Sequence, residues 1–116
     1  MRVLIAEDSE SVRCALRLVL EHLGHEVVAQ AANGEEAVAL FLQQHPELVV
    51  MDVRMPVMDG LASTSLLRQL DPQARVVIVT AGRTTEFQAR AAGADAFLEK
   101  PFDLTHLGEV IDHLAA

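Results

Sequence analysis

The chain has 116 residues, of which 51% are hydrophobic, and its formal net charge is −8. This size favours one compact domain over residues 1–116, and the single cysteine excludes both an internal disulfide and a cysteine-based zinc cluster. The negative net charge disfavours direct binding of nucleic acid. No apolar run is long enough to cross a membrane, and we therefore expect a cytoplasmic protein.

Short apolar runs alternate with amphipathic stretches five times along the chain. The runs are mostly β-branched and are predicted to form strands at residues 3–6, 26–29, 48–51, 76–79 and 96–98. Because consecutive positions are apolar, each strand is expected to be buried on both faces, as in a parallel sheet that helices cover.

The stretches between these strands are predicted to be helices. The first has an apolar stripe and stops before Gly24, a residue suited to the C-terminal end of a helix. The others are predicted at residues 33–45, 61–70, 85–92 and from 103 to the end of the chain. Five strand–helix units with right-handed crossovers predict an α/β fold, a five-stranded parallel sheet with helices on both faces.

Charged and polar side chains follow the carboxyl ends of four predicted strands, the edge at which open α/β sheets bind ligands. These residues are Glu7, Asp8, Asp52, Thr80 and Lys100. Any one of them alone is most simply a solvated loop residue, but five at one edge indicate a site. Because two carboxylates about 4 Å apart repel by roughly 4 kcal/mol at an effective dielectric near 20, three of them require a cation. An oxygen-only set favours Mg²⁺.

These residues stand in motifs that resemble the receiver domain of two-component response regulators. The motifs are Glu7-Asp8, the run Asp-Val-Arg-Met-Pro-Val-Met-Asp-Gly at 52–60, Val-Thr-Ala at 79–81, Ala-Gly-Ala-Asp at 92–95 and Lys-Pro-Phe at 100–102. The resemblance covers essentially the whole chain. It implies a flavodoxin-like (βα)5 receiver fold and a signalling function rather than that of an enzyme with a separate substrate.

The resemblance also implies roles for individual residues. Asp52 would accept a phosphoryl group from a histidine kinase, a histidine phosphotransfer protein or a small donor such as acetyl phosphate. Asp8 would bind Mg²⁺ directly and Glu7 through water, with Asp52 and the backbone carbonyl of Arg54 as further ligands. Lys100 and the Thr80 hydroxyl would contact the phosphoryl oxygens.

A switch is implied as well, in which Thr80 moves toward the phosphate and Phe97 turns inward. Pro101 would follow a cis peptide bond. The fourth helix, the fifth strand and the last helix would form the output surface and, on activation, a homodimer interface. Because Gly82 has no side chain that could position an attacking water, we expect slow self-dephosphorylation.

Two other functions remain open at this point. A pseudo-receiver would keep the fold as an interaction module without phosphorylation, but it is expected to lack part of the residue set. An Mg²⁺-dependent hydrolase of the haloacid dehalogenase type would need Asp-x-Asp after the first strand, where this chain has Glu7-Asp8-Ser9-Glu10.

Overall fold

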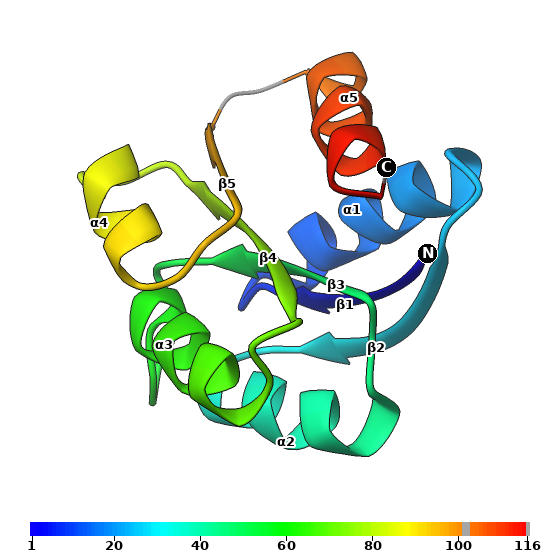
Figure 1. The fold of residues 1–116 in the computed structure, drawn as a ribbon. Helices are drawn as coiled ribbons and strands as arrows, with labels where there is room; N and C mark the ends of the chain where they lie inside the picture. Colours follow the sequence, from blue (N-terminus) through cyan, green and yellow to red (C-terminus); the bar gives the residue numbers. More distant parts are fainter. Residues whose placement is uncertain (101–102, 116) are drawn as a thin grey trace.

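The computed structural model describes residues 1–100 and 103–115, so the cis peptide predicted before Pro101 lies outside the described residues. Strands and helices alternate along the chain (Figure 1). In chain order they are β1 Arg2–Ala6, α1 Glu10–His22, β2 Glu26–Ala31, α2 Gly34–Gln44, β3 Leu48–Asp52, α3 Gly60–Leu70, β4 Arg75–Thr80, α4 Glu86–Ala91, β5 Ala96–Glu99 and α5 Leu104–Ala115.

Within these residues the strands form one sheet in the order β2-β1-β3-β4-β5, and every neighbouring pair is parallel. The predicted α/β fold with a five-stranded parallel sheet is therefore confirmed. The strand order reverses between β1 and β3, which lie side by side at the centre of the sheet. The carboxyl ends of these two strands are the position at which such sheets bind ligands.

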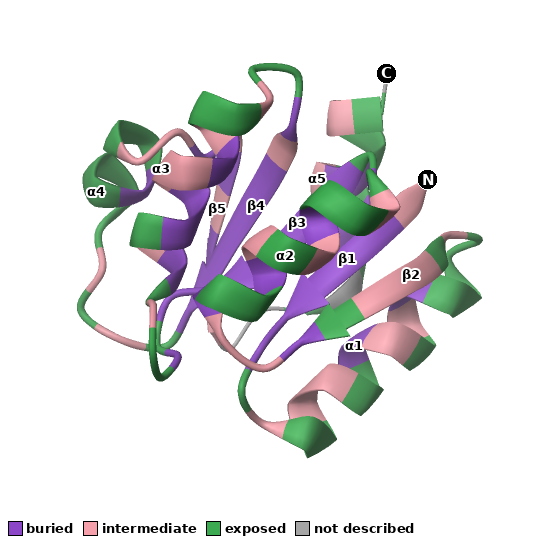
Figure 2. Cartoon of the chain, turned by 90° about the horizontal axis from the view of Figure 1, so that it is seen from below, coloured by how far each residue is buried: buried purple, intermediate pink, exposed green. Residues whose placement is uncertain are grey.

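Helices cover both faces of the sheet, and each face has its own apolar core. On one face, α1 and α5 bury Leu16, Leu20, Leu107 and Ile111 against the sheet. On the other, α2, α3 and α4 bury Ala37, Phe41, Leu67 and Ala89. Figure 2 shows the result, with the central strands buried between the two layers of helices. All five residues of β3 are buried, so packing on both faces of the sheet fixes the position of Asp52 at the end of this strand.

Side-chain caps fix where the helices begin. Ser9 caps α1, Asn33 caps α2, Asp59 caps α3 and Thr85 caps α4, in each case by accepting a backbone N–H from the first turn. The helix predicted over residues 85–92 is shorter in the structure, because Thr85 and Ala92 are its caps. Six residues remain in α4.

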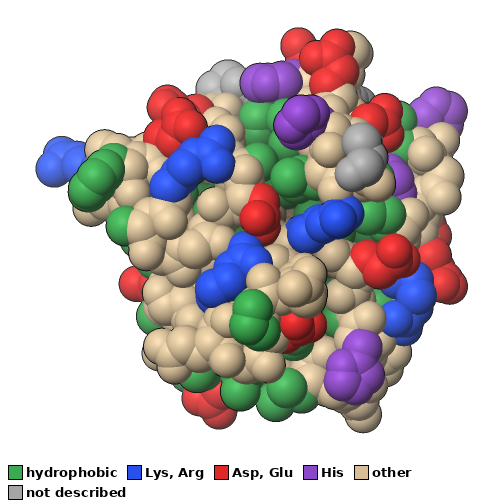
Figure 3. Space-filling view, viewed as in Figure 1, with side chains coloured by type: hydrophobic (Ala, Val, Ile, Leu, Met, Phe, Trp, Pro, Cys, Tyr) green, Lys and Arg blue, Asp and Glu red, His purple; other side chains and the backbone are tan. Residues whose placement is uncertain are grey.

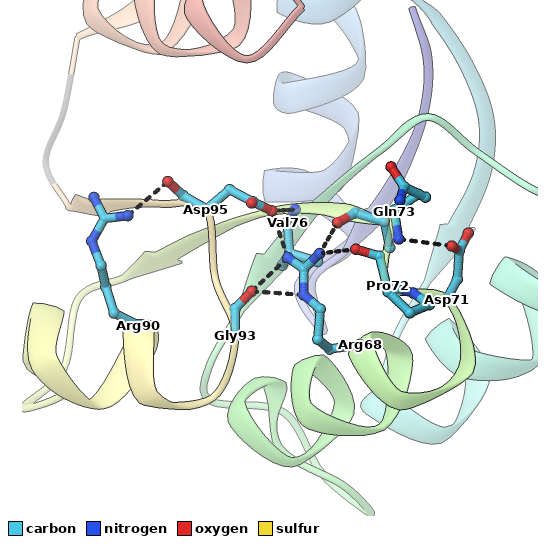
Figure 4. Close-up of polar contacts among 9 residues, drawn as sticks. Arg68, Asp71, Pro72, Gln73, Val76, Arg90, Gly93 and Asp95 are labelled. Atoms are coloured by element: carbon cyan, nitrogen blue, oxygen red, sulfur yellow. Dashed lines mark hydrogen bonds and ion pairs between the residues drawn. The ribbon is translucent and has the colours of Figure 1, made fainter.

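Arg68 of α3 connects three segments at the edge of the sheet opposite the carboxyl ends (Figure 4). Its guanidinium donates to the carbonyl oxygens of Gly93, Pro72 and Ala74 and to the Asp95 carboxylate, the last at 2.6 Å. The same carboxylate oxygen accepts the backbone N–H of Val76 at 2.8 Å. One half-buried arginine thus joins α3 to the start of β4 and to the turn before β5.

Among the described residues, no helix has both the length and the apolar character needed to span a bilayer. On the face shown in Figure 3, arginine and lysine side chains are scattered among acidic ones and do not gather into a basic patch.

Candidate functional site

Three acidic side chains predicted to converge meet at the carboxyl edge of the sheet. Glu7 and Asp8 follow β1, and Asp52 is the last residue of β3. Each contributes a carboxylate oxygen to a group in which these atoms lie within 4.8 Å of one another. Because β1 and β3 are hydrogen-bonded neighbours, the convergence follows directly from the strand order.

Asp52 is held in a fixed orientation at the end of its strand. It is 6% exposed, and its Oδ1 atom accepts the backbone N–H of Val53 at 2.7 Å. The helix that follows comes very close, since a Cβ atom at Gly60 would overlap the carbonyl of Asp52. A glycine is therefore required at the first position of α3, and Oδ2 is the Asp52 oxygen left for other contacts.

Lys100 follows β5 and brings a positive charge to the carboxylates. Its Nζ atom lies 3.3 Å from Oδ2 of Asp52 and 3.5 Å from Oε1 of Glu7. Its backbone N–H donates to the carbonyl of Thr80 at 2.8 Å, which fixes the end of β5 beside the end of β4. The ammonium group contacts two of the three acids, but its single positive charge does not balance the cluster, which keeps an excess of negative charge.

The surroundings of Glu7 change its pKa strongly. Burial, followed by the neighbouring Asp52 carboxylate, raises the pKa of Glu7 to about 8, although Lys100 acts in the opposite direction. Its Oε2 atom is buried and has no hydrogen-bond partner among the described residues. A buried oxygen without a partner, beside two further carboxylates, fits a hard divalent cation with oxygen ligands.

Thr80 and Phe97, the predicted switch pair, occupy different environments. Thr80 is buried, and its Oγ1 atom accepts the N–H of Gly82 at 3.1 Å. Phe97 is half-buried in β5 and borders a surface groove of about 460 Å³ against α5. Histidine and acidic side chains lie around apolar ones on this face in Figure 3. The aromatic ring is therefore not enclosed in the core.

The side chain of Arg54 lies across the loop that follows β4. It is exposed, and a Cβ atom at Gly82 would overlap its guanidinium. The absence of a side chain at residue 82 thus makes room for Arg54 beside Thr80. The sequence singled out both positions but did not predict that they touch.

The loop between Asp52 and α3 contains a strained turn that sequence reasoning missed. The N–H of Met58 donates to the carbonyl of Pro56 at 2.7 Å, and Val57 between them has a φ of +69°. This is a γ-turn of the rare positive-φ kind, and a β-branched residue is poorly suited to it. Val57 is 76% exposed. No pattern in the sequence signals such a turn.

Comparison with known proteins gives one consistent family. A family model described as the response regulator receiver domain matches residues 3–112. The chemotaxis protein CheY of Bacillus subtilis (strain 168) is 37% identical over 113 residues, which cover 96% of this chain and 94% of that protein.

Two solved structures are similar over nearly the whole chain. A chain of the CheX–CheY–BeF3–Mg²⁺ complex from Borrelia burgdorferi has a TM-score of 0.94 at 28% identity and covers 100% of this chain and 90% of its own. The response regulator TrrA of Thermotoga maritima, solved in complex with Mg²⁺ and BeF, has a TM-score of 0.90 at 30% identity and covers 97% of each chain. The chain therefore belongs to the response regulator receiver domains, the phosphoacceptor modules of two-component signalling systems.

Proposed function

We propose that Asp52 is the phosphoacceptor of this receiver domain, that Glu7, Asp8 and Asp52 hold Mg²⁺, and that phosphorylation changes the surface formed by α4, β5 and α5. The observation that carries the proposal is the position of Lys100, whose ammonium contacts both Asp52 and Glu7. A cation and three carboxylates around one buried acceptor suit phosphoryl transfer, which depends on positioning and on compensation of charge.

The metal ligands would be the carboxylates of Glu7, Asp8 and Asp52, together with the backbone carbonyl of Arg54. When bound, Mg²⁺ would neutralise negative charge on the phosphoryl oxygens during transfer. Asp8 is exposed and suits a direct ligand that also meets solvent, whereas Glu7 is buried and suits contact through an ordered water. The partnerless Oε2 atom of Glu7 supports a ligand role for this residue.

In the transfer step, an Asp52 carboxylate oxygen attacks phosphorus while the bond to the donor breaks. With a phosphohistidine the P–N bond breaks and imidazole leaves, and with acetyl phosphate the P–O bond breaks and acetate leaves. Lys100 pairs with one phosphoryl oxygen, and the Thr80 hydroxyl donates to another. Because Val53 already fixes one oxygen of Asp52, the acceptor needs little reorganisation before attack.

The phosphorylated state would act through Thr80 and Phe97. The phosphate adds roughly 1.5 to 2 negative charges, which attract the Thr80 hydroxyl away from the N–H of Gly82. Phe97 then turns from the groove beside α5 toward the space that Thr80 leaves. The groove would change shape, and partner binding or a homodimer through α4, β5 and α5 would respond.

The phosphoryl donor that we propose is a histidine kinase or a histidine phosphotransfer protein. The domain itself would catalyse its phosphorylation by the donor and its slow dephosphorylation. Residues 1–116 would act as one receiver unit in the cytoplasm, without direct contact to nucleic acid. Nothing in the site favours the pseudo-receiver or hydrolase alternatives.

The test is phosphorylation followed by intact mass. Wild type and Asp52→Asn are incubated with acetyl phosphate in Mg²⁺ or in EDTA. We expect one phosphoryl adduct on wild type in Mg²⁺ alone, and none on the variant. An adduct on Asp52→Asn would assign the acceptor elsewhere, and no adduct on wild type with either small or protein donors would overturn the proposal.

A further inference from the structure

The loop between β1 and α1 has to place two acidic residues within very little chain. β1 ends at Ala6 and α1 begins at Glu10, so the loop comprises Glu7, Asp8 and the cap Ser9. The backbone N–H of Glu7 donates to Ala31 at 2.9 Å, which secures the start of the loop. Among the described residues, no hydrogen bond holds the side chain of Asp8.

The side chain of Arg13, in the first turns of α1, contacts the backbone carbonyl oxygens of both acidic residues. Its Nη1 atom donates to the carbonyl oxygen of Glu7 at 2.6 Å and lies 3.3 Å from that of Asp8. Its own backbone N–H donates to the carbonyl of Ser9 at 2.9 Å, so the arginine is fixed at the start of α1. A carbonyl oxygen defines the plane of its peptide, and these contacts therefore orient the peptide units from which Asp8 and Ser9 extend.

We propose that Arg13 is a positioning residue that holds the Glu7–Asp8 loop in the arrangement that binds Mg²⁺. This inference rests on the proposed function. Both contacts of the Arg13 side chain are to backbone carbonyl oxygens of the loop and not to the carboxylates. The residue therefore acts through the geometry of the loop, much as partners behind metal ligands orient those ligands in other sites.

Arg17 provides a matched control on the same helix. It lies one turn further along α1, where its Nη1 atom pairs with Glu21 at 3.1 Å, and it touches neither loop carbonyl. Arg17→Gln removes the same charge as Arg13→Gln. A difference between the two variants thus isolates the contact with the loop from the change in net charge.

The experiment measures Mg²⁺ affinity by isothermal titration calorimetry on the unphosphorylated protein. We expect Arg13→Gln to raise the Kd for Mg²⁺ about tenfold, and Arg17→Gln to leave it at the wild-type value. Phosphorylation by acetyl phosphate should then need more Mg²⁺ in Arg13→Gln, with the wild-type rate restored at saturating Mg²⁺. A role confined to folding would instead lower the stability in EDTA and leave the Mg²⁺ affinity of the folded protein unchanged.

Other results decide against the inference. An unchanged or tighter Kd in Arg13→Gln would overturn it, and so would an equal loss in Arg17→Gln. If Arg13→Gln does not fold, Arg13→Lys, whose shorter side chain keeps the charge, is expected to bind Mg²⁺ more weakly than wild type, and wild-type affinity there would overturn the inference. Wild type that binds no Mg²⁺ would contradict the proposed function itself, which keeps the two failures distinct.

Discussion

The Nζ atom of Lys100 lies 3.3 Å from Oδ2 of Asp52, although 48 residues separate them in the chain. Lys100 follows β5 and Asp52 is the last residue of β3, and β4 lies between those two strands in the sheet. The ion pair therefore depends on the packing of the whole carboxyl edge. It also places the only lysine of the chain against the proposed phosphoacceptor.

Replacing Lys100 by glutamine should slow phosphorylation without changing the acceptor. The variant loses the ammonium that would pair with a phosphoryl oxygen, and removal of one such group typically costs about 100-fold in rate. The rate of adduct formation with acetyl phosphate, followed by intact mass in saturating Mg²⁺, checks this. Arg83→Gln, which removes an exposed positive charge from the loop after β4, should retain the wild-type rate. Equal rates for the two variants would rule out the role given to Lys100.

The stability of the metal-free protein should fall as the pH rises through neutrality. Burial and Asp52 raise the pKa of Glu7 from 4.5 to about 8 in the folded state, so between these values the folded chain binds more protons than the unfolded chain. The free energy of unfolding then decreases by at most about 1.4 kcal/mol per pH unit. Urea unfolding in EDTA, followed by circular dichroism, measures this slope.

The slope should be measured above about pH 7. Burial lowers the pKa of His25, so the contribution of His25 to the pH dependence of stability is confined to lower pH. Glu7→Gln removes the titrating group and should flatten the slope. Saturating Mg²⁺ should flatten it as well, since the metal competes with the proton. A slope that persists unchanged in Glu7→Gln would show that another group is responsible.

Val57→Asn should stabilise the protein by about 1 kcal/mol, because asparagine adopts the left-handed region at lower cost than a β-branched residue. The side chain is exposed, so little packing is lost in the exchange. Chemical denaturation in Mg²⁺-free buffer measures the change. Val57→Thr is the control: it introduces a polar group but keeps the branched Cβ, and it should bring no gain. An equal gain in both variants would attribute the effect to polarity rather than to the backbone.

Arg68→Met should lower the free energy of unfolding by about 2 kcal/mol, since hydrogen bonds from a charged donor to half-buried acceptors are lost. Methionine keeps much of the apolar stem, so the change reports mainly on the contact to Ala74 and on the contacts to Gly93 and Asp95 that Figure 4 shows. Urea unfolding again provides the measurement. Arg17→Met, which breaks an exposed pair with Glu21 and a long contact to the Cys14 sulfur, should cost no more than about 0.5 kcal/mol. Similar losses in the two variants would mean that the Arg68 network adds nothing to stability.

Arg54→Ala should shorten the lifetime of the phosphorylated state severalfold. The guanidinium lies over Gly82 in the loop that follows Thr80, and we expect it to limit the approach of water to the phosphoryl group. Loss of the phosphoryl group is followed by intact mass after the donor is removed. Arg83→Ala, in the same region but without this packing, should leave the lifetime unchanged. A longer lifetime in Arg54→Ala would reverse the interpretation of slow self-dephosphorylation.

The sheet could be predicted from sequence because apolar runs such as 48–51 and 76–79 are long enough to identify buried strands. Their ends could not be placed as well, since Arg2, Gln30 and Glu99 are polar and join the ladder through backbone hydrogen bonds that leave no apolar signal. The meeting of Glu7, Asp8 and Asp52 was predictable for a different reason. Parallel strands bring their carboxyl ends to one edge whatever residues they contain.

Three of the features that sequence reasoning missed are of one kind. Arg13, Arg68 and the turn at Val57 all depend on where a backbone carbonyl lies in space. Such contacts have no periodicity and no fixed spacing, and arginine residues elsewhere in the chain look the same in sequence. The roles of Arg54 through its carbonyl and of Pro101 through its peptide bond stay predictions.

Every residue of β3 is buried, with an apolar core on each side of the strand. This has a practical consequence for anyone who wants to follow signalling in this domain by distance measurements. Because the central strands are enclosed on both faces, we expect them to move little on phosphorylation. Movement should therefore be sought in the segments at the surface of the domain. A spectroscopic probe at Phe87 on the short helix α4, where the ring is 82% exposed, would report on such a segment without disturbing either core.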